Sequence, residues 1–257
     1  MKSKRTLFTI ISAALWLVIW LILARLANRE IFFPSPGAVL SSLGALARSK
    51  EFYSRIFVSL SGIAAGFLAG VAAGIPLSVL AFRFPFFEAF IGVPIKIIKA
   101  VPVASFVILA LLWLDSDKLS ILISAMMVMP VIYTNTLSGL RSADPKMLEF
   151  AKVFRLSAGK RVRYIYIPAI ISPLISASSV AIGFAWKSGI AAEIIGLIRG
   201  SIGNELYKAK LYLETPKLFA WTVTVVLISV LCEKIIVLLL SLAGKALGGV
   251  NDDGHTN

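Results

Sequence analysis

Hydrophobic residues in this chain form long runs without charge, separated by short polar segments. Six such runs are present, at residues 6–24, 56–82, 100–114, 119–140, 164–186 and 218–232. Because about 20 apolar residues in a helix span a bilayer, four of these runs are long enough alone. The third and sixth runs reach that length with the neighbouring residues 89–99 and 235–242. The pattern predicts an all-α, polytopic membrane protein with six transmembrane helices.

Composition supports the same class. Hydrophobic residues make up 58% of the 257 positions and charged residues 15%, with a mean hydropathy of +0.90. Soluble globular domains contain about 25% charged residues on average. This balance therefore excludes an ordinary soluble chain.

Histidine and cysteine, which serve many catalytic and metal sites, occur once each. The single histidine, His255, lies in a polar tail, and the single cysteine, Cys232, lies in an apolar run. Neither a metal cluster nor a Cys/His or Ser/His/Asp catalytic group can be built from this chain alone. The sequence also lacks a phosphate-binding glycine loop. We expect no enzymatic activity, no metal and no cofactor of its own.

The net charge of +13 reflects membrane topology rather than nucleic-acid binding, because the basic residues flank the apolar runs. Seven of them fall in the short segment 141–163. Dense basic residues in a short loop mark the cytoplasmic side of a membrane protein. We therefore expect this segment in the cytoplasm and, with an even number of spans, both termini there too.

The second apolar run carries a glycine at every fourth position. These glycines are Gly62, Gly66, Gly70 and Gly74. A helix face made of small residues lets another membrane helix approach closely, so the stripe predicts helix packing. The alternative is that small residues are simply frequent in membrane helices. The pattern does not identify the partner helix.

The polar segment between the fourth and fifth runs is amphipathic. Asp144 followed by Pro145 is typical of a helix start, because the Asp side chain can cap free backbone N–H groups. Apolar residues then recur at three- and four-residue spacing on one predicted face: Met147, Leu148, Ala151 and Phe154. We expect this helix to end near residues 157–159 and to contact another protein. A similar start, Ser35 before Pro36, predicts an amphipathic helix in the outer loop before the second run.

This segment resembles a signature of the permease subunits of ABC importers, the binding-protein-dependent transport system inner membrane components. The signature runs Glu-Ala-Ala, then Gly, then Ile-x-Leu-Pro at fixed spacing. The positions that match in type and spacing are Glu149, Ala151, Ile165 and Pro168. Ile167 replaces the Leu, Phe150 replaces the second residue, and Arg155 replaces the Gly. Because arginine is unsuited to a sharp turn, we expect Gly159 to supply that turn four residues later.

Further stretches resemble the nitrate, sulfonate and taurine branch of this family, over roughly residues 30–245. They are Phe33-Pro34-Ser35-Pro36, Lys99-Ala100-Val101-Pro102, Trp113, Asn135-Thr136, Gly139-Leu140-Arg141-Ser142 with Asp144-Pro145, Ala185-Trp186 and Glu193. The branch usually follows its Trp with Phe-Gly, whereas this chain has Leu114-Asp115.

The resemblance implies the type I ABC importer permease fold. Residues 1–29 would form an N-terminal transmembrane helix, and residues 30–245 a core of five further spans with a cytoplasmic coupling loop at 141–164. Residues 246–257 are expected to be a disordered tail. The implied location is the plasma (inner) membrane of a prokaryote.

The resemblance also implies the partners. Two permease chains, alike or different, form the pathway, an extracytoplasmic binding protein delivers the substrate, and separate ATP-binding subunits bind ATP. The coupling loop docks on those subunits, and its expected docking residues are Asp144, Met147, Leu148, Glu149, Ala151, Phe154, Arg155, Gly159, Ile165 and Pro168. Glu149 is expected to hold the loop by bonding to backbone or by pairing with Lys152 or Arg155.

Charges near the fifth apolar run point to the pathway. A charged side chain at mid-membrane costs about 2.5–3.5 kcal/mol, so Lys187 should face a cavity, a partner or an interface. We expect Lys187, with Lys99, to line the pathway and favour an anion; alternatively, both lysines reach a membrane surface. The full set of pathway candidates is Lys99, Asn135, Trp186, Lys187 and Glu193.

The predicted function is that of a non-catalytic permease subunit of an ATP-driven importer, for a small anion such as a sulfonate, taurine or nitrate. A permease for another small nutrient, such as an amino acid or a pyrimidine precursor, is an alternative. A stand-alone secondary transporter is a second alternative, and it would favour broken helices repeated in two halves. The sequence contains no evident internal duplication of that kind.

Overall fold

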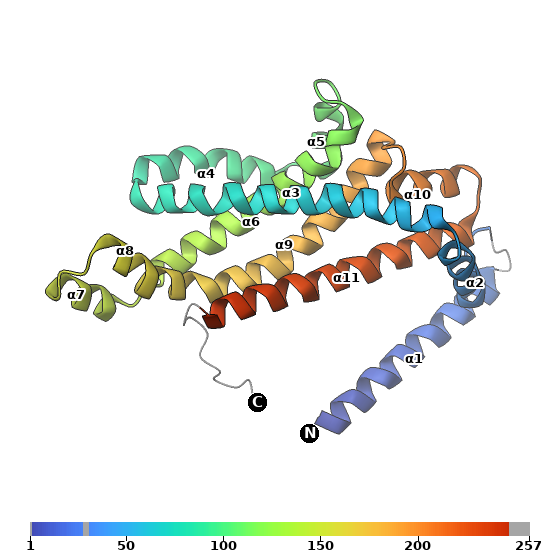
Figure 1. The fold of residues 1–257 in the computed structure, drawn as a ribbon. Helices are drawn as coiled ribbons and strands as arrows, with labels where there is room; N and C mark the ends of the chain where they lie inside the picture. Colours follow the sequence, from blue (N-terminus) through green and yellow to red (C-terminus); the bar gives the residue numbers. More distant parts are fainter. Residues whose placement is uncertain (1, 28–30, 247–257) are drawn as a thin grey trace.

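The chain folds as a bundle of helices. The computed structural model describes residues 2–27 and 31–246, and these residues contain no strand (Figure 1). Among them, five helices are long and apolar enough to cross a membrane: α1 (Lys2–Ala27), α3 (Lys50–Arg83), α6 (Leu119–Arg141), α9 (Ile167–Gly196) and α11 (Thr215–Ala246). The prediction of an all-α, multi-span protein is confirmed. The predicted disordered tail lies, from residue 247 onward, outside the described residues.

The third predicted span is a broken helix. It consists of α4 (Pro85–Ala100) and α5 (Val103–Ala110), which are bent by 104° relative to each other. Val101 at the break is extended, with φ −81° and ψ 134°, because the residue before a proline avoids helical geometry. Counted as one span, α4 and α5 bring the described spans to six. The expectation of one continuous helix through residues 89–114 is wrong.

The glycine stripe of α3 packs against α6. All four of its members, Gly62, Gly66, Gly70 and Gly74, face that helix. A Cβ atom added to Gly66 would lie 2.5 Å from the Ile121 carbonyl oxygen, and one added to Gly70 would lie 2.7 Å from Val128 Cβ. Contacts this short leave no room for a side chain, so glycine is what allows the two helices to approach. The structure thus identifies α6 as the partner helix, which the sequence pattern did not identify.

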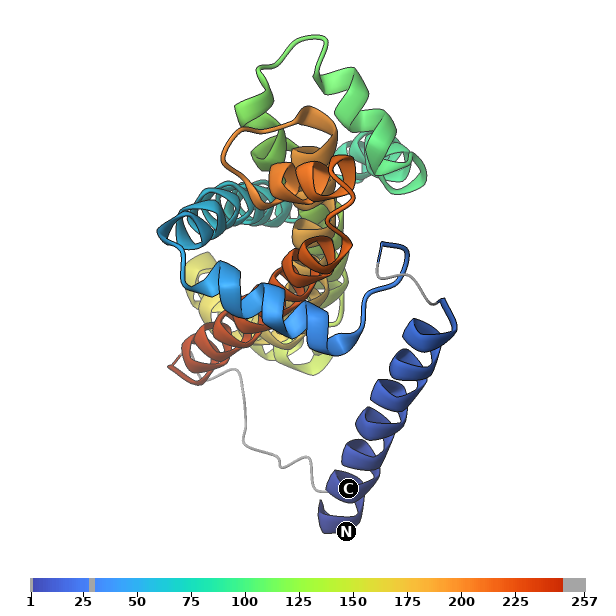
Figure 2. The same cartoon turned by 90° about the vertical axis from the view of Figure 1, so that its right-hand side faces the viewer.

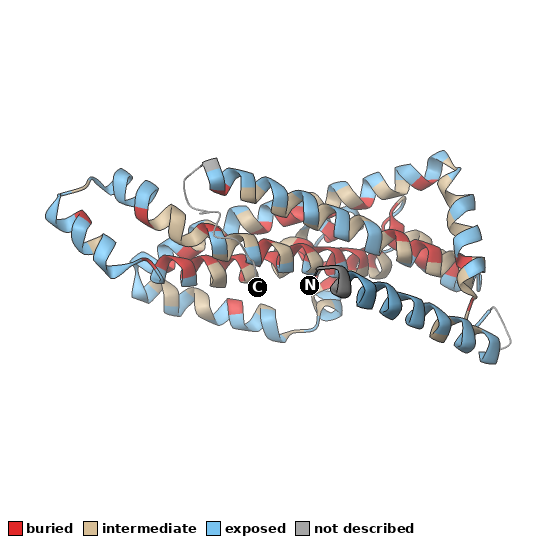
Figure 3. Ribbon diagram, turned by 90° about the horizontal axis from the view of Figure 1, so that it is seen from below, coloured by how far each residue is buried: buried red, intermediate tan, exposed pale blue. Residues whose placement is uncertain are grey.

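The core lies where α3, α6, α9 and α11 meet. Its largest cluster contains Ile63 of α3, Ile132 of α6, Ala181 and Trp186 of α9, and Trp221 of α11. Figure 3 shows the buried residues following these central helices, while the surfaces that face outward are exposed and apolar. Exposed apolar surface of this extent suits a lipid environment.

α1 stands apart from this core. It slants away from the other helices in Figures 1 and 2, and its apolar stretch Thr6–Ala27 is not buried against the rest of the described chain. The contact between α1 and the core lies toward the C-terminal end of α1. There the Trp20 indole N–H donates to the Pro34 carbonyl oxygen at 3.1 Å.

Serine caps determine where two helices begin. Ser35 caps α2 (Pro36–Ala47) by accepting a hydrogen bond from the Ala38 N–H at 3.2 Å, so the predicted start of this helix is confirmed. Ser49 caps α3 by accepting a hydrogen bond from the Phe52 N–H, also at 3.2 Å. Because of this cap, α3 begins before the charge-free run that starts at residue 56.

The short helices gather at the two ends of the bundle. One end carries α7 (Pro145–Val153) and α8 (Ala158–Arg161), and η2 (Val162–Tyr166), a turn of π-helix, leads from them into α9 (Figure 1). The opposite end carries α2 and α10 (Ile202–Leu211), while η1 (Ser116–Lys118) connects α5 to α6. The predicted coupling loop therefore lies at the end of the bundle opposite to α2 and α10.

Candidate functional site

The amphipathic segment begins as its sequence predicts. The Asp144 carboxylate accepts a hydrogen bond from the Lys146 N–H at 2.9 Å, and Pro145 is the first residue of α7. The helix ends at Val153, however, several residues before the expected end at 157–159. A tight C-terminal turn follows.

Arg155 itself makes that turn. Its φ of 47° lies in the left-handed region, where glycine is favoured. The Leu156 N–H donates to the Ala151 carbonyl at 2.9 Å, and the Arg155 N–H donates to the Lys152 carbonyl at 3.1 Å. This pair of bonds is the Schellman pattern that closes helices whose next residue is left-handed. The expectation that Gly159 supplies the turn is wrong, because Gly159 lies within α8.

α7 presents two apolar faces. Ala151 is 1% exposed and packs with Ala143, Ile165 and the half-buried Leu148, which holds the segment against the start of α9. The adjoining side of the helix is exposed and consists of Met147, Phe150, Val153 and Phe154, which we call the α7 apolar face. Of the four residues expected on one face, Leu148 and Ala151 are thus turned toward the protein, whereas Met147 and Phe154 are exposed.

The sequence interpretation missed Phe150. This residue counted as a departure from the signature, yet its ring lies 4.2 Å, between centroids, from that of Phe154. Phe150 is 51% exposed and Phe154 is 63% exposed. Residues four positions apart are neighbours on a helix surface, so the spacing of Phe150 and Phe154 is a sequence signal for this pair.

Exposed basic side chains flank the α7 apolar face in the sequence, on α7 itself and on the segment that follows it. They are Lys146, Lys152, Arg155, Lys160, Arg161 and Arg163. Glu149 is also exposed, and its side chain forms no hydrogen bond or ion pair with any residue that the structure describes. The expected pairing of Glu149 with Lys152 or Arg155 is absent within this described segment. Pro168 lies in the first turn of α9, directly after η2.

Lys99 and Lys187 line one cavity of about 620 Å³, which we call the lysine cavity. Its walls come from the bend between α4 and α5, the middle of α6 and the second half of α9. The other lining residues are Ile98, Ala100, Val101, Pro102, Val103, Met127, Pro130, Val131, Phe184, Ser188 and Ala191. None of these described lining residues is acidic. The broken third span creates one wall of this cavity.

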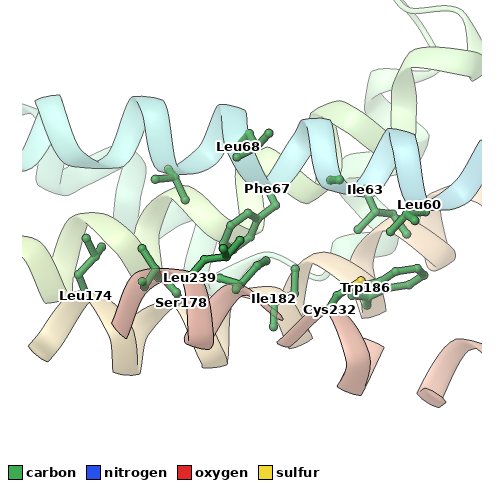
Figure 4. A pocket seen from close by; sticks show the side chains of 14 residues that line it. Leu60, Ile63, Phe67, Leu68, Leu174, Ser178, Ile182, Trp186, Cys232 and Leu239 are labelled. Atoms are coloured by element: carbon green, nitrogen blue, oxygen red, sulfur yellow. The ribbon is translucent and has the colours of Figure 1, made fainter. Parts of the chain in front are cut away.

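Trp186 and Asn135 do not line the lysine cavity. Trp186 borders a separate and almost wholly apolar cavity of about 380 Å³ between α3, α9 and α11, where it lies beside Cys232 (Figure 4). Asn135 donates from its side-chain amide to the Val131 carbonyl at 2.9 Å, one turn earlier in α6. Lys99 and Lys187 are thus the pathway candidates that the structure brings together.

Glu193 lies in a buried polar clamp. It is 1% exposed, and its Oε2 accepts hydrogen bonds from the Ser59 hydroxyl at 2.7 Å and from the Gly203 N–H at 3.0 Å. Ser59 also accepts a hydrogen bond from the Ile202 N–H at 2.8 Å. Glu193 therefore joins α3 and α9 to the N-terminus of α10, where free N–H groups favour a carboxylate. Residues outside the signature, such as Ser59, gave no sequence signal for this role.

Residues 62–248 match the family model described as the binding-protein-dependent transport system inner membrane component. The chain belongs to this family. The permease is 26% identical to a Bacillus subtilis protein provisionally named as an aliphatic sulfonates transport permease, over 80% of this chain and 75% of that protein. It is 23% identical to the taurine transport system permease protein of Escherichia coli, over 90% of this chain and 86% of that protein.

Family membership confirms the resemblance on which the functional interpretation rests. The permease is a multi-span inner membrane component of a transport system. The family model covers α3 from Gly62 onward, the spans that follow through α11, the lysine cavity and the α7 apolar face. These features are therefore parts of a transport subunit.

Proposed function

We propose that this permease forms, with a second permease chain, the pathway of an ATP-driven importer for a small anion such as a sulfonate, taurine or nitrate. The observation that carries the proposal is the presence of Lys99 and Lys187, from different helices, in one cavity that no acidic residue of the described chain lines. Two ammonium groups without a countercharge attract anions and repel cations. Charged side chains within spans generally mark substrate pathways.

The relatives support the same charge class. One bears a name for aliphatic sulfonates and the other for taurine, which contains a sulfonate group. Both kinds of substrate carry an anionic group that a lysine can bind by charge-assisted hydrogen bonds. An anion of this size fits within a cavity of about 620 Å³.

The α7 apolar face is the proposed docking surface for a separate ATP-binding subunit. In this proposal the subunit, and not the permease, binds ATP. An exposed pair of stacked phenylalanines on a short helix suits the helix-in-groove mode of recognition. The basic side chains that flank it favour a groove with an acidic rim. This docking would place α7, α8 and both chain termini in the cytoplasm, in agreement with the density of basic residues there.

Movement of the docked segment has a direct route to the lysine cavity. Ala151 of α7 packs in one cluster with Ile165 of η2 and Ala169 of α9, so α7 and the start of α9 would move together. α9 then continues without a break from Pro168 to Lys187, a length of about 28 Å at 1.5 Å per residue. Closure of two ATP-binding subunits would thus reorient the helix that carries Lys187 and expose the pathway alternately to each side. A binding protein would deliver the anion at the opposite, α10 end.

Reconstitution tests this proposal. The permease, its cognate ATP-binding subunit and binding protein are placed in liposomes, and uptake of radiolabelled taurine is followed with and without ATP. We expect uptake that requires ATP and all components, with competition by nitrate or other sulfonates and not by cationic amino acids. Transport by the permease alone without ATP would contradict the importer function. Better competition by a cationic amino acid would contradict the anion assignment.

A further inference from the structure

The helix that carries Lys99 packs against α3 and α6 through one small apolar cluster. Ile95, the buried residue of α4 among those described, lies in this cluster with Ala81 of α3 and with Tyr133 and Leu137 of α6. The half-buried Phe87 and Ile91 complete this contact. Apolar packing of this kind has no directional bonds, so it allows small sliding movements between two helices.

At the end that carries α7 and α8, α4 follows α3 directly through Phe84, and one ion pair joins α4 to α6. An Nη of Arg141 lies 2.6 Å from Oε2 of Glu88, within reach of a charge-assisted hydrogen bond. Glu88 lies in the first turn of α4, and Arg141 is the last residue of α6. Among the side chains that the structure describes, this pair is the one hydrogen-bonded ion pair between α4 and α6.

Both partners of this pair lie at the ends of helices, and α4 carries Pro94 in its interior. Ser142 closes α6 with backbone hydrogen bonds to the Ser138 and Gly139 carbonyls, and the capping residue Asp144 starts α7 almost immediately afterward. On the other side, α4 is helical from Glu88 to Lys99, a length of about 16 Å at 1.5 Å per residue. The ion pair and the cavity lysine therefore lie near opposite ends of the same helix.

We propose that the Glu88–Arg141 ion pair transmits movement of the docked α7 segment to α4 and thereby to Lys99. This inference rests on the proposed function, in which α7 receives movement from an ATP-binding subunit. It adds a second route to the one through α9, so that Lys99 and Lys187 move together when the lysine cavity opens or closes. Glu88 and Arg141 are positioning residues, because neither lines the cavity.

The expected effect is on transmission rather than on folding. The two side chains are 35% and 53% exposed, and ion pairs at such positions contribute little to stability. Residues that connect two moving elements can nevertheless change the coupling between sites by about 0.5–2 kcal/mol. Loss of the pair should leave the complex assembled while weakening the response of the cavity to ATP.

Cysteine labelling measures that response without knowledge of the substrate. Ala191, which lines the lysine cavity, is changed to Cys in a Cys232→Ser background. The permease is purified with its ATP-binding subunit, and the rate of reaction with a fluorescent maleimide is compared with and without MgATP. We expect ATP to change this rate in the parent protein.

Charge reversal then tests the ion pair. Glu88→Arg and Arg141→Glu should each reduce the ATP-induced change in labelling rate by roughly threefold or more. The double variant, Glu88→Arg with Arg141→Glu, should restore it. Lys96→Glu, an equal change of charge at an exposed position of α4 outside the cavity, is the matched control and should have no effect. Glu88→Gln provides a milder loss of the pair if Glu88→Arg fails to assemble.

The outcomes separate this inference from the proposed function. If ATP leaves the labelling rate of the parent complex unchanged, or the ATP-binding subunit does not bind, the proposed function fails. If the parent responds and Glu88→Gln and both single reversals respond equally well, the ion pair does not transmit movement. A double variant that is no better than the single reversals would also overturn the inference.

Discussion

Lys99 and Lys187 lie on different helices and line the same cavity. Lys99 lies two residues before Val101, where the third span bends by 104°. The residues of the bend, from Ile98 to Val103, line the cavity together with residues of α6 and α9. The broken span therefore forms the wall that carries one of the two cations.

Removing either cation should weaken anion transport. A hydrogen bond to a charged group contributes about 1.5–3 kcal/mol, so Lys187→Met and Lys99→Met should each lower the initial rate of taurine uptake by about tenfold or more. The measurement is ATP-dependent uptake in proteoliposomes at low substrate concentration. Lys96→Met, which changes an exposed lysine of α4 outside the cavity, is the control. Unchanged uptake in both cavity variants would show that these lysines do not bind the substrate.

The α7 apolar face should determine assembly with the ATP-binding subunit. Aromatic side chains at the centre of an interface often contribute about 2 kcal/mol or more, so Phe150→Ala and Phe154→Ala should release most of the subunit. Retention on an affinity-tagged permease in detergent measures this. Phe86→Ala removes another exposed phenylalanine, 84% exposed at the start of α4, and should retain the subunit.

Salt should weaken the same complex. The exposed basic side chains that flank the α7 apolar face attract an acidic rim through solvent, and such interactions are screened strongly above about 0.1 M salt. We expect the fraction of retained subunit to fall as sodium chloride rises from about 0.05 to 0.5 M. Retention that increases with salt would indicate an interface dominated by apolar contacts alone.

Arg155→Gly should stabilise α7. A side chain in the left-handed region costs about 1–2 kcal/mol that glycine avoids. Hydrogen–deuterium exchange of the α7 amides should slow by about fivefold, which corresponds to about 1 kcal/mol. Gly159→Ala, where an added Cβ meets no atom within 4 Å, is the control and should leave α7 exchange unchanged. Faster exchange in Arg155→Gly would mean that the guanidinium group stabilises the turn.

Substitution in the glycine stripe should destabilise the bundle according to the space available. Gly66→Ala and Gly70→Ala place a Cβ within 2.5–2.7 Å of α6 atoms, and overpacking typically costs about 1–3 kcal/mol. Thermal unfolding in detergent should show a lower midpoint for both variants. Gly92→Ala, in a helix with no atom near the added Cβ, should be neutral or stabilising. Equal midpoints for all three would contradict the packing of α3 on α6.

Local chemistry made the helix starts predictable from sequence. Ser35 before Pro36 and Asp144 before Pro145 each cap a helix as expected, because a cap depends on residues only a few positions apart. The apolar runs identified the spans for a similar reason, since length and hydropathy are properties of a single segment.

Features that depend on distant residues could not be predicted in this way. The four-residue spacing of glycines identified a packing face on α3, but it did not identify α6 as the partner helix. Nothing in the sequence placed Ser59 beside Glu193. The turn at Arg155 was missed for a different reason. Surrounding packing of Ala151 and Leu156 holds an arginine in a conformation that its own preference disfavours.

The unbroken course of α9 has a geometric consequence for how little movement transport requires. A tilt of about 5° around Pro168 displaces the backbone at Lys187 by about 2.5 Å, given the length of helix between them. That displacement is comparable to the diameter of a water molecule. A modest rotation of the segment that contacts the ATP-binding subunit would therefore be enough to admit or expel solvent beside Lys187, where the charged group of the substrate would bind.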